Sequence, residues 1–319
     1  MNKTNYESLT TNLCKEQYTT IGWIESLMSY NAAGMTAVIP GGVLCSVDKF
    51  GMNSEAVLNG VSRVLAEFVK QVGLEKSAGL VIPRFVPRLH DGVVVSSIAE
   101  EWVNNQCVLL GVDALEHVVL CWHDDTVPGV GACVKALRAV CSGDGESLPK
   151  VNRVVLSNAT KQSLRHCLIE GGKLDAVILP ALEVYTCKGE GVRSECAKLR
   201  IPIIMDDVLL GGLVDERYSR MQTPPDRALL RGTAAFDSLG VICNAAGGWE
   251  RFRCILSALE DTNRGVANAA IEYFTGAGSQ CIVETLLDGP SRYTIGGQTL
   301  TDADRENITK AMRAFAALG

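Results

Sequence analysis

Short apolar runs alternate with segments of helical periodicity through the middle of the chain. The runs are rich in Val, Ile and Leu, and the segments between them repeat apolar residues every three to four positions. We expect strands at Val118–Trp122, Val151–Ser157, Asp175–Pro180 and Ile201–Met205, and helices at Ser97–Leu110, Pro128–Cys141 and Leu164–Ile169. A loop and a helix are expected at Tyr185–Leu199. This alternation is typical of a mostly parallel sheet with helices on both faces, so the predicted fold class is α/β.

The two ends of the chain depart from this alternation. Residues 1–50 begin with a polar stretch and are predicted to form an N-terminal arm, followed by a large α/β domain at residues 51–248. Beyond it, two helical stretches precede two short apolar runs and a last helix that starts at Thr301. Residues 249–319 are therefore predicted to form a small C-terminal α+β lobe, and 319 residues are enough for two lobes.

The composition of the chain argues against a disordered protein, a general nucleic-acid binder and a membrane protein. A hydrophobic fraction of 47% and a charged fraction of 21% are ordinary for a globular protein with a sizeable core. A net charge of −6 and few aromatic residues argue against nucleic-acid binding, except for a local RNA contact. The start of the chain has no apolar signal segment, and the uncharged run at 26–47 is broken by Pro40 and glycines, so no membrane span is expected.

The twelve cysteines contain no C-x-x-C pair, which makes a structural zinc site of the usual kind improbable. In a chain without a secretion signal, such cysteines are expected to be reduced thiols in the core. We therefore predict a cytoplasmic protein with no bound metal.

Polar residues follow four consecutive apolar runs of the predicted sheet. They are His123-Asp124-Asp125-Thr126, Ser157-Asn158, Glu183 and Asp206-Asp207. Ligands of a parallel α/β sheet bind at the carboxyl ends of its strands, so these residues form the best candidate site. The turn from Asp125 to Gly129 opens a helix, and a helix N-terminus can hold an anion. Asp206-Asp207 fit a ligand contact and a turn or helix cap equally well.

Residues 97–248 resemble the fold-type I pyridoxal-phosphate enzymes, the superfamily of aspartate aminotransferase, class III and class V aminotransferases and the selenocysteine-synthesising enzymes. The segment Met205–Gly211 looks like that family's Asp-containing motif, and the resemblance places Asp206 against the pyridine nitrogen. It places Thr126 and Gly129 in the turn that holds the cofactor phosphate. Ser157 then stands at the strand end that usually carries the ring-stacking residue.

The lysine that forms the Schiff base in that family has no counterpart. The equivalent stretch, Asp226–Ala235, contains Arg231 but no lysine, and an arginine cannot serve as the amine nucleophile. The resemblance therefore implies a degenerate homologue without catalytic residues, which binds no cofactor or holds pyridoxal phosphate non-covalently. It is expected to act as a partner or regulatory subunit, in a homo- or hetero-oligomer with a related subunit.

Two alternatives stay open. An active B6-dependent transferase or lyase would take its lysine from an unexpected position, such as Lys188 in its glycine-flanked loop. A metal-dependent α/β enzyme of another class would use Asp206, Asp207 and His123, because carboxylates and imidazole are suitable metal ligands.

Overall fold

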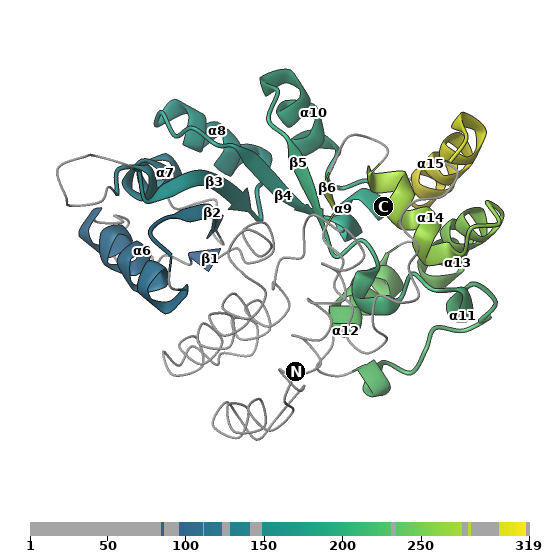
Figure 1. The fold of residues 1–319 in the computed structure, drawn as a ribbon. Helices are drawn as coiled ribbons and strands as arrows, with labels where there is room; N and C mark the ends of the chain where they lie inside the picture. The colour runs from purple at the N-terminus through teal and green to yellow at the C-terminus, as the bar shows by residue number, and fades with distance from the viewer. Residues whose placement is uncertain are drawn as a thin grey trace, which may run out of the picture. The chain divides into compact units, whose positions relative to one another are not determined.

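The structure is a computed structural model that describes residues 84–85, 96–110, 112–122, 128–140, 149–230, 234–245, 247–275, 280–281 and 300–316 (Figure 1). The predicted arm at residues 1–50 lies outside them. The chain divides into two compact units. The first includes the described residues up to Ile178 together with Ser194–Pro202, and the second includes Leu179–Arg193 and the chain from Ile203. The predicted boundary near residue 248 stays a prediction.

Helices and short strands alternate along the described chain. The elements are β1 (Arg84–Phe85), α6 (Ser96–Leu110), β2 (Leu115–Cys121), α7 (Val130–Arg138), β3 (Val151–Ser157), α8 (Lys161–Ile169), β4 (Ala176–Pro180), α9 (Ala181–Tyr185), α10 (Glu190–Leu199), β5 (Ile203–Asp206), η1 (Leu210–Gly212), α11 (Glu216–Ser219), η2 (Arg227–Leu230), α12 (Ala234–Asn244), α13 (Gly248–Glu260), α14 (Val266–Thr275), β6 (Gln280–Cys281) and α15 (Asp302–Ala316).

The strands of the first unit are parallel and pair in the order in which they occur along the chain. β1 pairs with β2, β2 with β3 and β3 with β4, and the register aligns Cys121 with Ser157 and Ser157 with Ile178. In the second unit β5 pairs with β6, also in parallel. The predicted α/β class with a parallel sheet is confirmed, and β3 has the predicted bounds.

The predicted loop and helix at Tyr185–Leu199 contain the last residue of α9, a turn and α10. The Thr186 hydroxyl donates to the carbonyl of Leu182 (2.8 Å), and Cys187 then adopts a left-handed conformation with φ 55°. These two features end α9 at Tyr185, and α10 begins at Glu190. Side-chain bonding to the preceding turn and a left-handed residue are common ways of ending a helix.

Helices α7 and α8 pack closely because glycines stand at their contact. A Cβ atom added to Gly131 would lie 2.5 Å from the Cβ of Glu170 and 2.6 Å from the carbonyl oxygen of Cys167. One added to Gly172 would lie 2.6 Å from the Cys167 sulfur and 3.0 Å from the Cα of Gly131. Neither position has room for a side chain without moving a helix backbone.

The carboxylate of Glu170, the residue that ends α8, caps the start of α7. Its Oε1 accepts from the N–H of Gly129 (3.0 Å), and its Oε2 accepts from the N–H groups of Gly131 (2.6 Å) and Ala132 (3.3 Å). These donors have no partner within their own helix, and the helix dipole favours a negative charge at this end. One side chain therefore satisfies three donors and joins the two helices.

The second unit has an aromatic core between α9, α13 and α14. The ring of Tyr185 stands edge-on to those of Phe252 and Phe274, with centroids 6.4 and 5.4 Å away. Its hydroxyl donates to the carbonyl of Val208 (3.0 Å), which provides the partner that a buried tyrosine needs. Tyr185 thereby connects α9 to the segment that follows β5.

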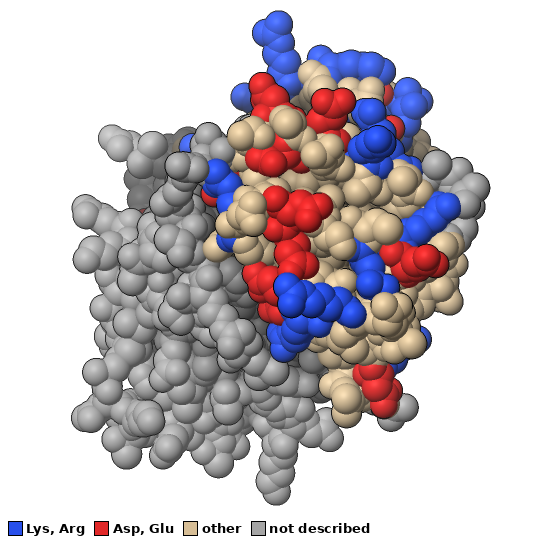
Figure 2. All heavy atoms as spheres, turned by 90° about the vertical axis from the view of Figure 1, so that its right-hand side faces the viewer, with Lys and Arg blue, Asp and Glu red and all other residues tan. Residues whose placement is uncertain are grey.

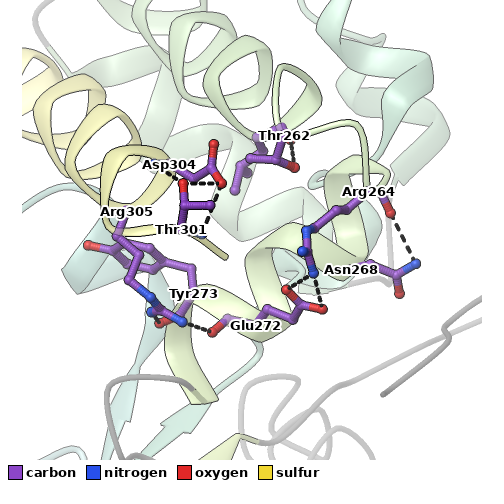
Figure 3. A network of polar contacts seen from close by, with 9 residues as sticks. Thr262, Arg264, Asn268, Glu272, Tyr273, Thr301, Asp304 and Arg305 are labelled. Carbon is purple, nitrogen blue, oxygen red and sulfur yellow. Dashed lines mark hydrogen bonds and ion pairs between the residues drawn. The ribbon is translucent and has the colours of Figure 1, made fainter. Parts of the chain in front are cut away.

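Polar contacts join α14 to α15 in the same unit (Figure 3). Arg305 of α15 donates to the carbonyls of Tyr273 (3.1 Å) and Glu272 (3.2 Å) in α14. Within the same segment, Arg264, just before α14, forms an ion pair with the Glu272 side chain (2.6 Å). At the start of α15, Asp304 accepts from the hydroxyl (2.7 Å) and the N–H (3.0 Å) of Thr301, and these bonds lower the pKa of its carboxyl. The α14 C-terminus is thus held by a cation, as its dipole favours.

Among the helices that the structure describes, none is both long enough and apolar enough to cross a membrane. The predicted cytoplasmic location stays a prediction.

Replacing Glu170 by Ala is expected to lower the free energy of unfolding by about 1–2 kcal/mol, because three helix N–H groups lose their acceptor. Urea unfolding followed by circular dichroism measures the change. Glu195→Ala is the matched control, because Glu195 forms ion pairs with the exposed side chains of Arg165 (3.8 Å) and Lys198 (3.5 Å), and its loss is expected to cost less than about 1 kcal/mol. Equal costs for the two variants would contradict the capping role.

Candidate functional site

The carboxyl ends of β2 and β3 bring three small or polar groups together in the first unit. Cys121 ends β2, Ser157 ends β3, and the two are aligned across the parallel pair, so their side chains share one face of the sheet. Trp122 follows β2, and its backbone N–H donates to the carbonyl of Ser157 (3.5 Å). All three are buried, with 3% or less of their surface exposed.

Trp122 carries a buried donor at this edge. Its indole N–H is enclosed and finds no acceptor among the residues that the structure describes. A buried donor without a partner costs about 1–3 kcal/mol, so such a group calls for an explanation. A ligand atom that accepts a hydrogen bond would satisfy it. The sequence predicted Trp122 as the end of a strand and as a core or interface aromatic, and nothing in the local pattern distinguishes an indole that has a partner from one that has none.

Ser157 and the residue after it complete the group. The Ser157 hydroxyl can donate and accept, as can the side-chain amide of Asn158. Asn158 has a left-handed backbone (φ 57°), which turns the chain away from β3 toward α8. Of the predicted cofactor-binding residues, Ser157 therefore lies at a strand end with hydrogen-bonding neighbours.

The predicted phosphate turn has a different occupant. Thr126 and the other residues of 123–127 lie outside the described chain, so the structure does not place them. Gly129, at the start of α7, has φ 113°, a conformation that favours glycine. Its N–H and those of Gly131 and Ala132 point to the Glu170 carboxylate, which fills the place where a phosphate would bind.

Asp206 and Asp207 lie in the second unit, at the end of β5, and the structure separates their roles. Asp206 ends the strand and is half-buried. The Oδ1 of Asp207 accepts from the N–H of Gly211 (2.7 Å), and Asp207 itself has φ 49°. Asp207 is therefore a turn cap, whereas a ligand role for Asp206 stays a prediction.

Glu183 and Lys188 also belong to the second unit. Burial raises the pKa of the Glu183 carboxyl, and the nearby Lys188 ammonium lowers it in part. Glu183 contributes its backbone carbonyl to the turn, accepting from the N–H of Gly189 (3.0 Å). Lys188 itself is exposed to solvent, where a lysine is not activated as a nucleophile.

The buried thiols are poorly suited to nucleophilic chemistry. Burial raises the pKa of Cys133 and of Cys167 to about 12, and that of Cys196 to about 11. A thiol reacts through its thiolate, and at neutral pH almost none of these groups is ionised.

The described residues contain no cluster of metal-ligating side chains, and one face of the molecule carries charges of both signs. No group of three His, Cys, Asp or Glu among the described residues could hold a metal ion. Figure 2 shows acidic and basic side chains interspersed over the face it draws. Pairs such as Arg220 with Glu260 (2.8 Å) contribute to this mixture.

Comparison with known proteins gives a result at the level of fold. No family model matches the chain, and no curated protein does. Among solved structures, an aldo-keto reductase from Bacillus halodurans in its holo form aligns with TM-score 0.60, 10% identity and coverage of 94% of this chain and 89% of that one. A glycerol dehydrogenase from Gluconobacter oxydans aligns with TM-score 0.60, 14% identity and coverage of 92% and 85%. An aldo/keto reductase from Brucella melitensis aligns with TM-score 0.55, 13% identity and coverage of 90% and 89%.

These neighbours show that the resemblance to fold-type I pyridoxal-phosphate enzymes is wrong. The hypothesis of a degenerate homologue falls with it, as do both alternatives, the B6 enzyme with a displaced lysine and the metal-dependent enzyme. A doubly wound sheet reverses its strand order at the point where ligands bind, whereas β1 to β4 pair in chain order without a reversal.

The predicted cofactor, none or non-covalent pyridoxal phosphate, is overturned by the same neighbours. At the predicted phosphate-binding turn the physical reason is the Glu170 carboxylate, which already binds the N–H groups at the N-terminus of α7. Association with a related subunit stays a prediction.

Asp207→Ala is expected to lower the free energy of unfolding by about 1–2 kcal/mol, since alanine neither caps Gly211 nor tolerates a positive φ. Asp207→Asn is expected to change it by only a few tenths, because asparagine does both. Urea midpoints of the two variants decide the matter. A loss in Asp207→Asn as large as in Asp207→Ala would mean that the charge of Asp207, rather than its turn geometry, is what matters.

Alkylation of the native protein with iodoacetamide at mildly alkaline pH is expected to label Cys254 and Cys243, which are exposed, and to spare Cys133 and Cys167. Peptide mass spectrometry measures the extent at each site, and the same reaction in denaturant shows that every thiol can react. Native labelling of Cys133 as fast as Cys254 would contradict its burial and raised pKa.

Proposed function

We propose that this protein is an oxidoreductase that interconverts a carbonyl compound and its alcohol, with a nicotinamide nucleotide as hydride partner. The scaffold would be an α/β barrel in which the helices form one layer outside the strands. Parallel strands in chain order support this arrangement, as do the contacts of α6 with α7 and of α7 with α8. The predicted open sheet has helices on both faces, whereas in the proposed barrel the helices cover only the outer face of the sheet.

One observation carries the proposal: solved aldo-keto reductases, and a glycerol dehydrogenase among them, align with about nine-tenths of this chain. Barrel enzymes build their active sites at the carboxyl ends of the strands. Cys121, Trp122, Ser157 and Asn158 lie at these ends of β2 and β3. The best-defined polar group of the first unit is thus at the edge where the proposed fold requires a site.

The groups present at this edge fit a nicotinamide and an oxygen-bearing substrate. A carboxamide needs a donor and an acceptor, and the Ser157 hydroxyl can act as either. The buried indole N–H of Trp122 needs an acceptor, which a carbonyl or hydroxyl oxygen provides. When bound, a reduced nicotinamide would supply the hydride for reduction of the carbonyl carbon.

The residues of this edge would orient the ligand and hold its oxygen. Reduction of a carbonyl also requires a proton at the oxygen. The described residues at the carboxyl ends of β2 and β3 (Cys121, Trp122, Ser157 and Asn158) include no carboxylate, histidine or lysine that could supply this proton. These strand ends would therefore position the ligand, and the proton would come from another group.

The first test is binding of NADH and NADPH to the purified full-length chain, measured by isothermal titration calorimetry. One of the two is expected to bind saturably. Ser157→Ala and Trp122→Phe are each expected to raise the Kd of the nucleotide or the KM of the substrate by about three- to tenfold, the effect of one lost hydrogen bond. Ser238→Ala, a buried serine of the second unit, is the matched control and should leave both unchanged.

Turnover is measured as loss of the reduced nicotinamide's absorbance with a panel of aldehydes and ketones, and in reverse with glycerol and other polyols. Hydride transfer should depend on both the nucleotide and the carbonyl compound. Saturable nucleotide binding with no turnover across the panel would reject an oxidoreductase, and no binding of either nucleotide would reject the proposed cofactor.

A further inference from the structure

Helices α8 and α10 leave two large apolar side chains exposed near their C-terminal ends. Ile169 is 82% exposed and Leu199 is 41% exposed, whereas most large apolar side chains of the first unit are buried. An ion pair between Arg165 and Glu195 (3.8 Å) joins the two helices one turn earlier in each. The two exposed side chains therefore stand at the same end of neighbouring helices, which lie at the top of Figure 1.

Exposed basic residues lie close in sequence to each of these two apolar side chains. We define the α8–α10 patch as Arg165, Ile169, Lys173, Lys198, Leu199 and Arg200, all exposed and all within the first unit. The carboxylates close to these residues in sequence are engaged: Glu170 caps α7, Asp175 pairs with Arg138, and Glu195 pairs with Arg165 and with Lys198 (3.5 Å). The patch is strongly basic in a chain whose net charge is −6.

Arg200 occupies a position that normally favours glycine. α8 and α10 end in the same way: the N–H of Gly171 bonds Leu168 and that of Gly172 bonds Cys167, while the N–H of Arg200 bonds Ala197 and that of Ile201 bonds Cys196. In this ending one residue must be left-handed, and it is Gly171 (φ 77°) in α8 but Arg200 (φ 55°) in α10. An arginine is disfavoured in that conformation, so Arg200 costs some stability where it stands.

We propose that the α8–α10 patch is a docking surface for an acidic amphipathic helix of a partner protein. Leucine or isoleucine side chains of that helix would cover Ile169 and Leu199, and its carboxylates would pair with Arg165, Lys198 and Arg200. A second copy of this chain does not fit in a two-fold arrangement, because it would bring one basic rim against another. A lipid surface fits less well, because two aliphatic side chains offer little apolar area to insert.

The probe is a synthetic fluorescein-labelled helical peptide with Leu on one face and Glu elsewhere, tested against the full chain by fluorescence anisotropy. A second peptide has Lys in place of every Glu. The Glu peptide should bind saturably and more weakly as salt rises, and the Lys peptide should not bind. Ile169→Ser combined with Leu199→Ser should weaken binding by about tenfold. Val108→Ser, an exposed valine of α6, is the matched control and should leave binding unchanged.

Arg200→Gly separates function from folding. It should raise the melting temperature by about two degrees, because glycine suits the left-handed position, and at the same time weaken peptide binding. Equal binding of the two peptides, no binding of the Glu peptide, or binding unaffected by the patch variants would each overturn the proposal. Tight binding to vesicles of phosphatidylserine without binding to the Glu peptide would overturn it in favour of a lipid surface.

Discussion

The terminal backbone groups of helices need hydrogen-bond partners, and α7, α14 and α15 obtain some of theirs from charged side chains of neighbouring helices. Glu170 of the α8 terminus holds the first N–H groups of α7, and Glu216 of α11 holds the first N–H of α14 (2.9 Å). At the opposite polarity, Arg305 of α15 holds carbonyls near the end of α14, and Arg251 of α13 holds the carbonyl of Ala314 (2.7 Å). Each contact satisfies a terminal group that the helix cannot satisfy itself, and it also fixes the position of one helix against another.

The capping of α7 by Glu170 also affects where a ligand can bind. A helix N-terminus is a ready anion site only while its donors are available, and in α7 they are engaged within the protein. At the ends of β2 and β3, by contrast, the hydroxyl of Ser157 and the indole of Trp122 are buried polar groups of the first unit. Polar residues at the end of a strand and at the start of a helix look alike in sequence. In this chain the N–H groups at the start of α7 are bound by Glu170, whereas the indole N–H of Trp122 has no acceptor among the described residues.

Much of the local structure was predictable, and the way the strands pair was not. The apolar run Val151–Ser157 predicted β3 without error, and Gly171-Gly172 marked the end of α8, because both signals are contained in a few consecutive residues. The family resemblance depended on a different kind of information. Asp206-Asp207 after an apolar run is consistent with any parallel α/β sheet, since every such strand needs a turn at its end. Glu170 shows the same limit: 39 residues separate it from Gly131, so no local pattern could reveal its role.

The contact between Gly131 and Gly172 constrains how this chain can change over generations. Each glycine leaves room for the backbone or side chain that faces it, so a methyl group at either one requires the two helices to separate. Separation would also lengthen the bonds from Glu170 to the start of α7. Homologues are therefore expected to keep both glycines or to replace them together with Cys167 and Glu170, as one co-varying set. A small sterically locked crossing of this kind would persist long after overall identity has fallen too low to reveal ancestry.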